Sequence, residues 1–230
     1  MYVHSTNGLL HSRLIMKINE VTKGANLPTV TFPKGKLFHV GKMNKALKRK
    51  NSLEGRGLSV STHPNEWATI TSLPGNIYSI HKNGNKFIDA RSLSNHQIEQ
   101  IQNWAIQDKL IEPSTIYRYT FSSGEDGEEM YTDATTKDEL IRDYDAEEDE
   151  ITVINNSIKP TQKLKQLSMN HDMTGGNDTI DYVLPLYAEY DNYDGVWWND
   201  TLDVLSYSAP RGVIVPSKIK EFDVEDYENK

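Results

Sequence analysis

The sequence predicts an α+β fold, with a compact split β-sheet core of short strands and a few flanking helices. Two observations predict it: short strand-like runs are interleaved with few helix-like segments, and the two kinds do not alternate regularly. Twelve tyrosines and four tryptophans supply bulky core material in a chain with only 37% hydrophobic residues. We divide the 230 residues into an N-terminal extension (1–33), a single α+β domain (34–220) and an acidic tail (221–230).

The N-terminal half of the domain is predicted to contain four strands and two helices. Glycines bound the first two strands, and Pro64 in a first turn favours a helix that Thr62 caps. The Asn-Gly-Asn run at 83–85 is typical of a hairpin turn between two strands. Ser94 and Gln97 form a capping box for the clearest helix, whose apolar residues recur at helical spacing. The expected strands are 36–41, 57–61, 76–82 and 86–90, and the expected helices are 62–72 and 94–110.

The C-terminal half is predicted to be mainly β, with one short helix started by Thr135 or Thr136. The segment 182–187 is apolar and rich in residues that favour strands. The segment 195–200 holds the aromatic pair Trp197–Trp198, and a final apolar run is expected to close the sheet. No element is predicted between 160 and 180. The expected strands are 116–121, 150–155, 182–187, 212–216 and 219–224, and the expected helix is 136–144.

The composition excludes several classes of protein. A net charge of -8 argues against a general nucleic-acid coat protein, because neutralising phosphates takes an excess of lysine and arginine. No apolar run is long enough to span a membrane, and the N-terminus lacks the pattern of a secretory signal, so no membrane partner is expected. The absence of cysteine removes disulfides and thiolate metal sites and fits a reducing compartment, so we predict a cytoplasmic protein.

The charge is unevenly distributed along the chain. Basic residues gather in the stretch 34–50, where they form either a solvated face or a local site for the phosphates of a dinucleotide or a nucleic acid. Acidic runs lie at 125–129, 143–150 and 221–228, and we expect them in solvated loops and in a mobile tail.

Motifs that would identify a common enzyme class are absent. The sequence has no GxGxxG or P-loop phosphate cradle, no GxSxG nucleophile elbow and no HExxH zinc motif. The seven histidines are scattered without the spacing of metal ligands, so no metal site is predicted. Nothing indicates a nucleophilic triad either, although the members of a triad need not be close in sequence.

A paired feature remains. The segment Leu37-Phe-His-Val-Gly41 is followed by Glu54-Gly-Arg-Gly-Leu-Ser-Val-Ser-Thr-His-Pro-Asn-Glu-Trp67. These segments resemble the two N-terminal motifs of the ADP-ribosyltransferase-like superfamily, in its histidine-containing branch. The family pattern is an aromatic-His-Gly strand, a variable loop, a Gly-Leu-Tyr/Ser-x-Ser/Thr strand and a helix that opens near a proline. The resemblance covers a third of the chain and implies the family's fold, NAD as cofactor and transfer of ADP-ribose to an acceptor.

The resemblance assigns roles to the residues of these motifs. His39 would hold the adenosine ribose of NAD, and Gly41 would leave room for nicotinamide at the backbone. The strand 59–61 would shape the nicotinamide pocket, where the family's frequent tyrosine is missing, and Trp67 could close the wall instead. Taken without its neighbours, His39 is better explained as an ordinary strand histidine with a satisfied hydrogen bond. The candidate cofactor-binding residues are His39, Val40, Gly41, Ser59, Ser61, Thr62, Trp67 and Trp197.

The family's third motif is a carboxylate on a late strand that stabilises an oxocarbenium-like transition state. Pro210 or Arg211 stands where that glutamate is expected, so this sequence departs from the family pattern. Asp200 is the preferred replacement because it follows the aromatic pair and could lie in a partly desolvated pocket. The alternatives are Asp194 and Asp203. The predicted catalytic residues are His39 and Asp200.

The function predicted from this resemblance is that of a mono-ADP-ribosyltransferase, which transfers ADP-ribose from NAD to a protein or nucleic-acid acceptor. Proteins of this superfamily often serve as toxins or as effectors in conflict between phages and bacteria, a context that only the resemblance implies. The alternative is a non-catalytic binding module that docks a basic partner protein through acidic surfaces and the aromatic pair. Two further possibilities stay open: a hydrolase or RNA-processing phosphotransferase, and a structural protein without a small-molecule site.

Overall fold

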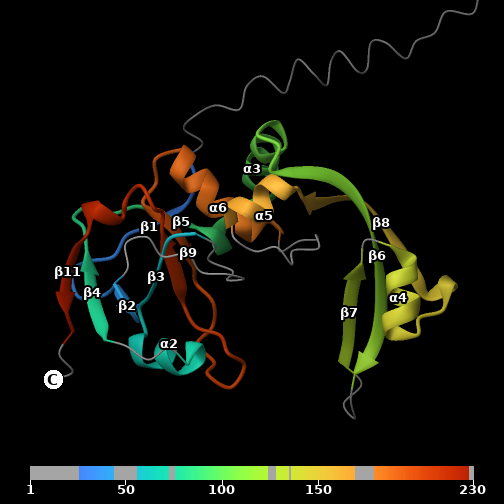
Figure 1. Ribbon diagram of the computed structural model, residues 1–230, viewed down its shortest axis with the longest axis horizontal. Helices are drawn as coiled ribbons and strands as arrows, with labels where there is room; N and C mark the ends of the chain where they lie inside the picture. The colour runs from blue at the N-terminus through green and yellow to red at the C-terminus, as the bar shows by residue number, and fades with distance from the viewer. Residues whose placement is uncertain are drawn as a thin grey trace, which may run out of the picture.

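The computed structural model describes residues 26–43, 56–72, 76–123, 128–134, 136–168 and 179–227. These residues form a mixed fold built on a curled eight-stranded sheet and a separate three-stranded sheet (Figure 1). The large sheet runs in the order β1-β5-β9-β10-β3-β2-β4-β11. Its strands are β1 Thr29–Val30, β2 Phe38–Val40, β3 Leu58–Ser61, β4 Ile77–His81, β5 Phe87–Asp89, β9 Gly195–Trp198, β10 Arg211–Ile214 and β11 Asp223–Asp226.

Neighbouring strands of the large sheet are antiparallel, except that β5 and β9 run parallel. A mostly antiparallel sheet does not arise from repeated strand–helix–strand units, so the fold mixes strands and helices without a doubly wound core, as predicted. The helices that pack on this sheet or beside it are α2 Pro64–Thr71, α3 Asn95–Gln107, α5 Gln162–Ser168 and α6 Thr179–Tyr190.

Side-chain alternation gives the large sheet two apolar faces. Val196 and Trp198 of β9 point to the face covered by α3 and α6, which we call the helix face. Trp197 points to the opposite face, which we call the inner face, where it packs in a cluster with Phe87 and Ile214. Because successive residues of a strand point to opposite sides, the aromatic pair is divided between two cores.

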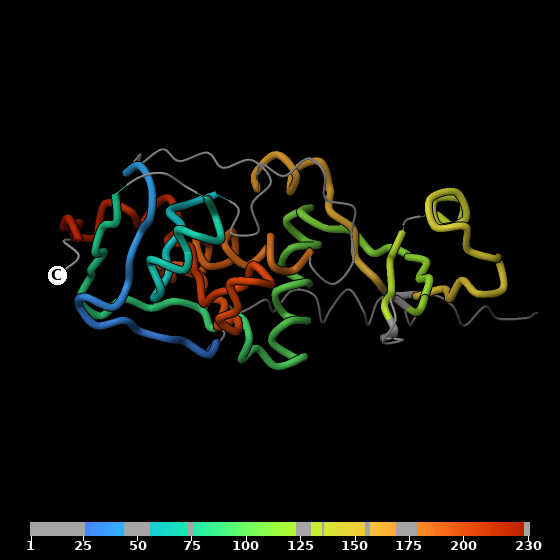
Figure 2. The backbone as a smooth tube through the Cα atoms, turned by 90° about the horizontal axis from the view of Figure 1, so that it is seen from below, coloured from blue at the N-terminus to red at the C-terminus, as the bar shows by residue number. Residues whose placement is uncertain are grey.

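The second sheet forms an arm that extends from the main body (Figures 1 and 2). It contains β6 Ile111–Ser123, β7 Glu128–Ala134 and β8 Ile151–Pro160 in the order β7-β6-β8, with α4 Lys137–Tyr144 packed on it. Ile111, at the start of β6, is buried in the core of the main body. Farther along the same strand, Tyr117 and Tyr119 pack against a small separate core around Leu140 and Ile151. The long strands β6 and β8 therefore connect two distinct apolar clusters.

Two glycines fix how closely the strands around β10 approach one another. A Cβ on Gly195 would lie 1.9 Å from the carbonyl oxygen of Val213 and 2.9 Å from the ring of Phe87. A Cβ on Gly57 would lie 2.4 Å from the carbonyl oxygen of Ile214, and the φ angle of +152° there also favours glycine. Glycine stands at the starts of β3 and β9 because the adjacent backbones leave no room for a side chain.

Several predicted elements are confirmed. The strands at 36–41, 57–61 and 212–216 correspond to β2, β3 and β10. The strand at 116–121 lies within β6, and the one at 150–155 overlaps the first half of β8. Ser94 and Gln97 form the predicted capping box of α3, and Thr136 caps α4 with Glu139. Each of these helices begins where a hydroxyl side chain accepts a hydrogen bond from an otherwise unpaired N–H group.

Four predicted details are wrong. The strands β4 and β5 do not form a hairpin, because β4 pairs with β2 and β11 while β5 pairs with β1 and β9. The segment 182–187 lies in helix α6 and not in a strand, and α5 was not predicted. His63, and not Thr62, is the N-cap of α2. The segment 219–224 divides into a 3-10 helix, Ile219–Glu221, and the start of β11.

Both ends of the chain contribute more to the fold than the sequence indicated. Leu27 is buried in the core of the main body, and β1 forms one edge of the large sheet. The acidic segment 221–228 was expected in a mobile tail, but Asp223–Asp226 forms β11 at the other edge. Its side chains are all exposed, whereas Phe222 just before it is buried. Backbone pairing with β4 is therefore compatible with an acidic sequence, because the charges remain in water.

The buried hydroxyl of Tyr187 predicts a pH dependence of stability. Burial, helped by the nearby Asp191, raises the pKa of Tyr187 from 10.0 to about 12. The ionised unfolded chain is thus favoured once the pH passes 10, so Tyr187 contributes stability below pH 10 that is lost as the pH rises towards 12. Such a rise in pKa corresponds to about 2 to 3 kcal/mol in the free energy of unfolding.

The free energy of unfolding of Tyr187→Phe should fall less between pH 8 and pH 11 than that of the unmodified protein, because phenylalanine does not ionise. Urea unfolding at each pH measures this free energy. The exposed Tyr131 gives a matched control, because Tyr131→Phe should leave the alkaline loss as it is in the unmodified protein. Parallel pH profiles for all three proteins would contradict the assignment.

No helix among the described residues has the length and apolar character needed to cross a membrane.

Candidate functional site

The candidate site begins with His39 in the middle of the large sheet. His39 is 1% exposed, and its Nδ1 lies 2.7 Å from the carbonyl oxygen of Ser59 on the neighbouring strand β3. A carbonyl oxygen only accepts, so Nδ1 carries the proton and donates it. On the other side of the ring, Nε2 lies 3.4 Å from the carbonyl oxygen of Lys42. These contacts fix the orientation of the ring and connect β2 to β3. They are also what an ordinary structural histidine with a satisfied hydrogen bond would show.

The predicted cofactor residues lie on two faces of the sheet. His39 pairs with Tyr78, their rings 6.4 Å apart, and Tyr78 packs against the inner-face cluster. Val40 points the other way and packs with Trp67 and Ala209. Ser59 and Ser61 pair with Val213 and Arg211 and share the helix face with them. The motif thus brings these residues onto adjacent strands, but it does not place all their side chains together.

Two buried polar atoms of β3 and α2 have no hydrogen-bond partner among the described residues. They are Oγ of Ser59, which is 1% exposed, and Nε1 of Trp67 at the start of α2. Leaving such a group unpaired costs about 1 to 3 kcal/mol relative to a satisfied one. Trp67 packs with Val40 and Ala209, and Ser59 lies on β3, the strand beside Val40.

The remaining N-terminal candidates have partners within the protein. Oγ of Ser61 donates to the carbonyl oxygen of Pro210 at 2.6 Å and accepts from the backbone N–H of His63 at 3.1 Å. Oγ1 of Thr62 lies 2.9 Å from Nδ1 of His63. The N–H of Gly41 donates to the carbonyl oxygen of Asn76 at 3.0 Å, and the φ of Gly41, +120°, explains the glycine. These residues connect β3, β10 and α2.

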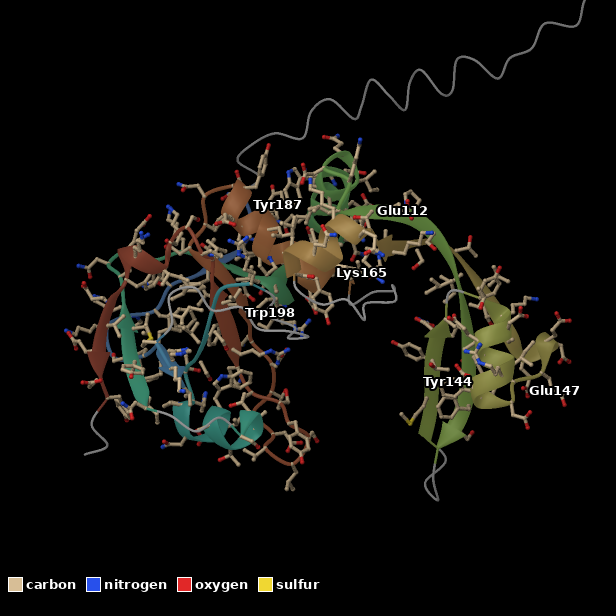
Figure 3. The ribbon with its side chains drawn as sticks, viewed as in Figure 1. Glu112, Tyr144, Glu147, Lys165, Tyr187 and Trp198 are labelled. Carbon is tan, nitrogen blue, oxygen red and sulfur yellow. The ribbon has the colours of Figure 1, made fainter. Side chains whose placement is uncertain are left out.

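Trp197 lies apart from the other cofactor candidates. It is 3% exposed on the inner face, where its ring centroid is 4.5 Å from that of Phe32. Trp198 is also buried, but on the helix face, with Nε1 donating to Oδ1 of Asp181 at 2.9 Å (Figure 3). The aromatic pair is therefore not available as a docking surface, because strand alternation buries each ring in a different core.

The three candidate acids have different surroundings. Asp194 is buried, pairs with Lys82 and accepts from the backbone N–H of Lys86 at 2.8 Å, which is a structural arrangement. Asp203 is exposed and accepts from the N–H groups of Leu205 and Ser206 within a tight loop. The hydrogen bonds from Ser206 lower the pKa of Asp203. Neither aspartate matches the expected catalytic acid. Asp194 is engaged by Lys82 and Lys86, and Asp203 is exposed to water.

Asp200 lies in what we call the arginine–carboxylate cluster, formed by Arg91, Asp181, Asp200 and Arg211. Nε of Arg91 donates to Oδ1 of Asp200 at 2.8 Å, and Nη1 of Arg211 donates to Oδ2 at 2.5 Å. Arg91 also lies 3.8 Å from Asp181. The side chains of Asp200 and Arg211 are only 13% and 11% exposed, so the pair is largely removed from water. Oδ1 lies 2.8 Å from both Nε and Nη2 of Arg91, so further acceptor capacity is expected at Oδ2.

Two members of this cluster, Arg91 and Asp181, were missed by the sequence reasoning. They come from the 3-10 helix after β5 and from the first turn of α6, far apart in the chain. The register explains their meeting: β5 runs parallel to β9, and Trp198 at the end of β9 pairs with Arg211 at the start of β10. The sequence signal for this cluster was Arg211, which stands at the position where the family pattern has its catalytic glutamate.

His39 and Asp200 belong to the same sheet but are not adjacent. Strands β3 and β10 lie between β2, which carries His39, and β9, which precedes Asp200. The basic side chains of 45–50 lie outside the described residues, whereas Lys34 pairs with Glu225 at 2.5 Å. Across the described ranges, no three histidine, aspartate or glutamate side chains form a group that could hold a metal ion.

Comparison with protein-family models, with curated proteins and with solved structures finds no match to this chain.

Proposed function

We propose that this protein binds NAD and acts as a mono-ADP-ribosyltransferase on a protein or nucleic-acid acceptor. One observation carries the proposal: the three segments singled out by the family resemblance form the adjacent strands β2, β3 and β10. They are far apart in sequence, yet His39 is hydrogen-bonded to Ser59, and Ser61 to Pro210.

The proposed cofactor contacts follow from this arrangement. His39 is held with a fixed tautomer and orientation, as a group that positions a ribose must be. Ser59 and Trp67 face the other side of the sheet, so the ribose contact proposed for His39 is assigned to the inner face alone.

The proposed reaction breaks the bond between nicotinamide nitrogen and the ribose carbon. The bonding electrons leave with nicotinamide, positive charge develops on the sugar, and a lone pair of the acceptor forms the new bond while the acceptor's proton passes to solvent. A carboxylate stabilises the developing charge, as in glycoside cleavage. Asp200 is our candidate, because it is largely removed from water and Oδ2, which accepts from Arg211, can still accept a ribose hydroxyl.

The experiment is a titration of NAD into the purified chain, with heat of binding and release of free nicotinamide followed in parallel. We expect saturable binding, and nicotinamide release that rises when a suitable acceptor is added. If NAD binds but no nicotinamide is released with any acceptor, the protein binds NAD without cleaving it. The role of Asp200 is then structural, as the partner of Arg91 and Arg211. No binding at millimolar NAD would overturn the proposal.

A further inference from the structure

The arm carries more negative charge than the whole protein. Residues 111–160 contain 14 aspartates and glutamates against 4 lysines and arginines, a net charge of -10, whereas the complete chain has -8. The rest of the chain is therefore slightly basic, at +2. The structure separates these charges in space, because the arm extends from the main body and has its own small core (Figure 1).

Ion pairs among the described residues of the arm engage the carboxylates of Glu112, Asp133 and Asp143. Arg118 pairs with Asp133 and Arg142 with Asp143, both at 2.7 Å. The acids that precede β8 are all exposed and lie on the outer side of the arm, where Figure 3 labels Glu147. Exposed acidic residues alone are typical of a solvated surface. Exposed apolar side chains beside them would instead indicate a binding surface.

Large apolar side chains are exposed on the same arm. Tyr131 is 57% exposed, Tyr144 49%, Met130 47% and Val153 45%. Met130 lies opposite Phe121 in the β6–β7 register, and the ring of Phe121 lies 6.2 Å from that of Tyr144 on α4. Met130 and Tyr144 extend the arm's core to the surface on the side of α4, whereas Tyr131 lies on the opposite face, where the guanidinium of Arg118 lies 3.9 Å from its ring.

A shallow cavity of about 190 Å³ lies between β7 and α4 beside these side chains. Its lining includes the apolar Ala134 and Leu140, the ring of Tyr144 and the carboxylates of Glu139 and Asp143. An aromatic ring with carboxylates at its edge suits the end of a lysine or arginine side chain, whose stem packs on the ring and whose charge meets the acids.

We propose that the arm is a docking surface for a protein partner that presents an extended, lysine- or arginine-rich segment with interspersed apolar residues. The apolar residues of the partner would cover Met130 and Tyr144, and its basic side chains would meet the surrounding carboxylates. Nucleic acid is excluded as the occupant by the same charge, because phosphates would be repelled. This surface does not depend on NAD binding.

The test uses a labelled peptide in which lysine alternates with leucine, bound to the full chain and followed by fluorescence anisotropy. Tyr144→Ala removes the exposed ring, and the pair Glu148→Lys and Asp149→Lys reverses charge at two exposed positions of the arm. We expect either change to weaken peptide binding by roughly tenfold, and added salt to weaken it further. A peptide with glutamate in place of lysine should not bind.

The matched control places the same charge change on the main sheet. Asp223→Lys with Asp226→Lys alters two exposed carboxylates of β11 and should leave binding unchanged. An equal loss in this control, failure of the unmodified chain to bind the peptide, or competition by a single-stranded RNA would each overturn the proposal. His39→Ala should bind the peptide normally, so failure of the arm proposal is distinguishable from failure of the NAD proposal. Circular dichroism of each variant shows that the fold is retained.

Discussion

His39→Ala is expected to abolish measurable NAD binding, with a loss in affinity of roughly thirtyfold or more. The substitution removes the group proposed to hold the adenosine ribose, a contribution of about 2 kcal/mol for a preorganised buried hydrogen bond. It also leaves the carbonyl oxygen of Ser59 without the donor that now lies 2.7 Å from it. Isothermal calorimetry with NAD measures the affinity, and thermal unfolding measures the accompanying loss of stability.

A second substitution separates binding from folding. In His39→Asn the amide can still donate to the carbonyl oxygen of Ser59 in place of Nδ1, but nothing replaces Nε2. We expect His39→Asn to unfold at nearly the temperature of the unmodified protein and yet to lose NAD. If His39→Asn bound NAD as tightly as the unmodified chain, His39 would be a structural histidine and its assignment to the ribose would be wrong.

Asp200→Ala is expected to reduce nicotinamide release by about a hundredfold or more, the usual effect of removing one electrostatic stabiliser of a transition state. It is also expected to lower the free energy of unfolding by about 2 kcal/mol. The reason is that Arg211, 11% exposed, loses the carboxylate that neutralises it. Single-turnover release of nicotinamide at saturating NAD measures the first effect, and urea unfolding measures the second.

The two effects of Asp200 have different controls. Asp203→Asn removes the same charge at an exposed loop nearby and should leave both release and NAD affinity unaltered. Asp200→Asn retains the size of the side chain, and its amide oxygen can still accept from one arginine. It should therefore reduce nicotinamide release strongly but lower the free energy of unfolding less than Asp200→Ala does. Full turnover in Asp200→Asn would show that the carboxylate serves only to hold Arg91 and Arg211.

The sequence predicted those elements whose signals are local. Ser94 with Gln97 and Thr136 with Glu139 specify helix starts, because capping hydrogen bonds connect residues three apart. The strands β2, β3 and β10 were likewise predicted, because each has glycine at or near a boundary and apolar residues within. His39 and the 59–61 strand were found for the same reason, since each motif lies within one short segment.

Tertiary contacts decided the elements that the sequence misjudged. The segment 182–187 has strand-like composition, but it forms α6 because a helix there buries Val183, Leu184 and Tyr187 against α3 and β9. The expected hairpin fails because the side-chain amide of Asn85 bonds both backbone groups of Phe32. That contact helps to direct β5 to β1, away from β4.

By itself, the sequence determined the mixed fold, the helix caps and the two N-terminal motifs, since these depend on composition and on neighbours within a few residues. Only the tertiary structure decided that Trp197 and Trp198 are buried on opposite faces and that Arg91 and Arg211 hold Asp200. It also revealed the acidic arm as a body extending from the main sheet. The physical reason is register: strand pairing between distant segments sets which side chains meet, and no local pattern encodes that pairing.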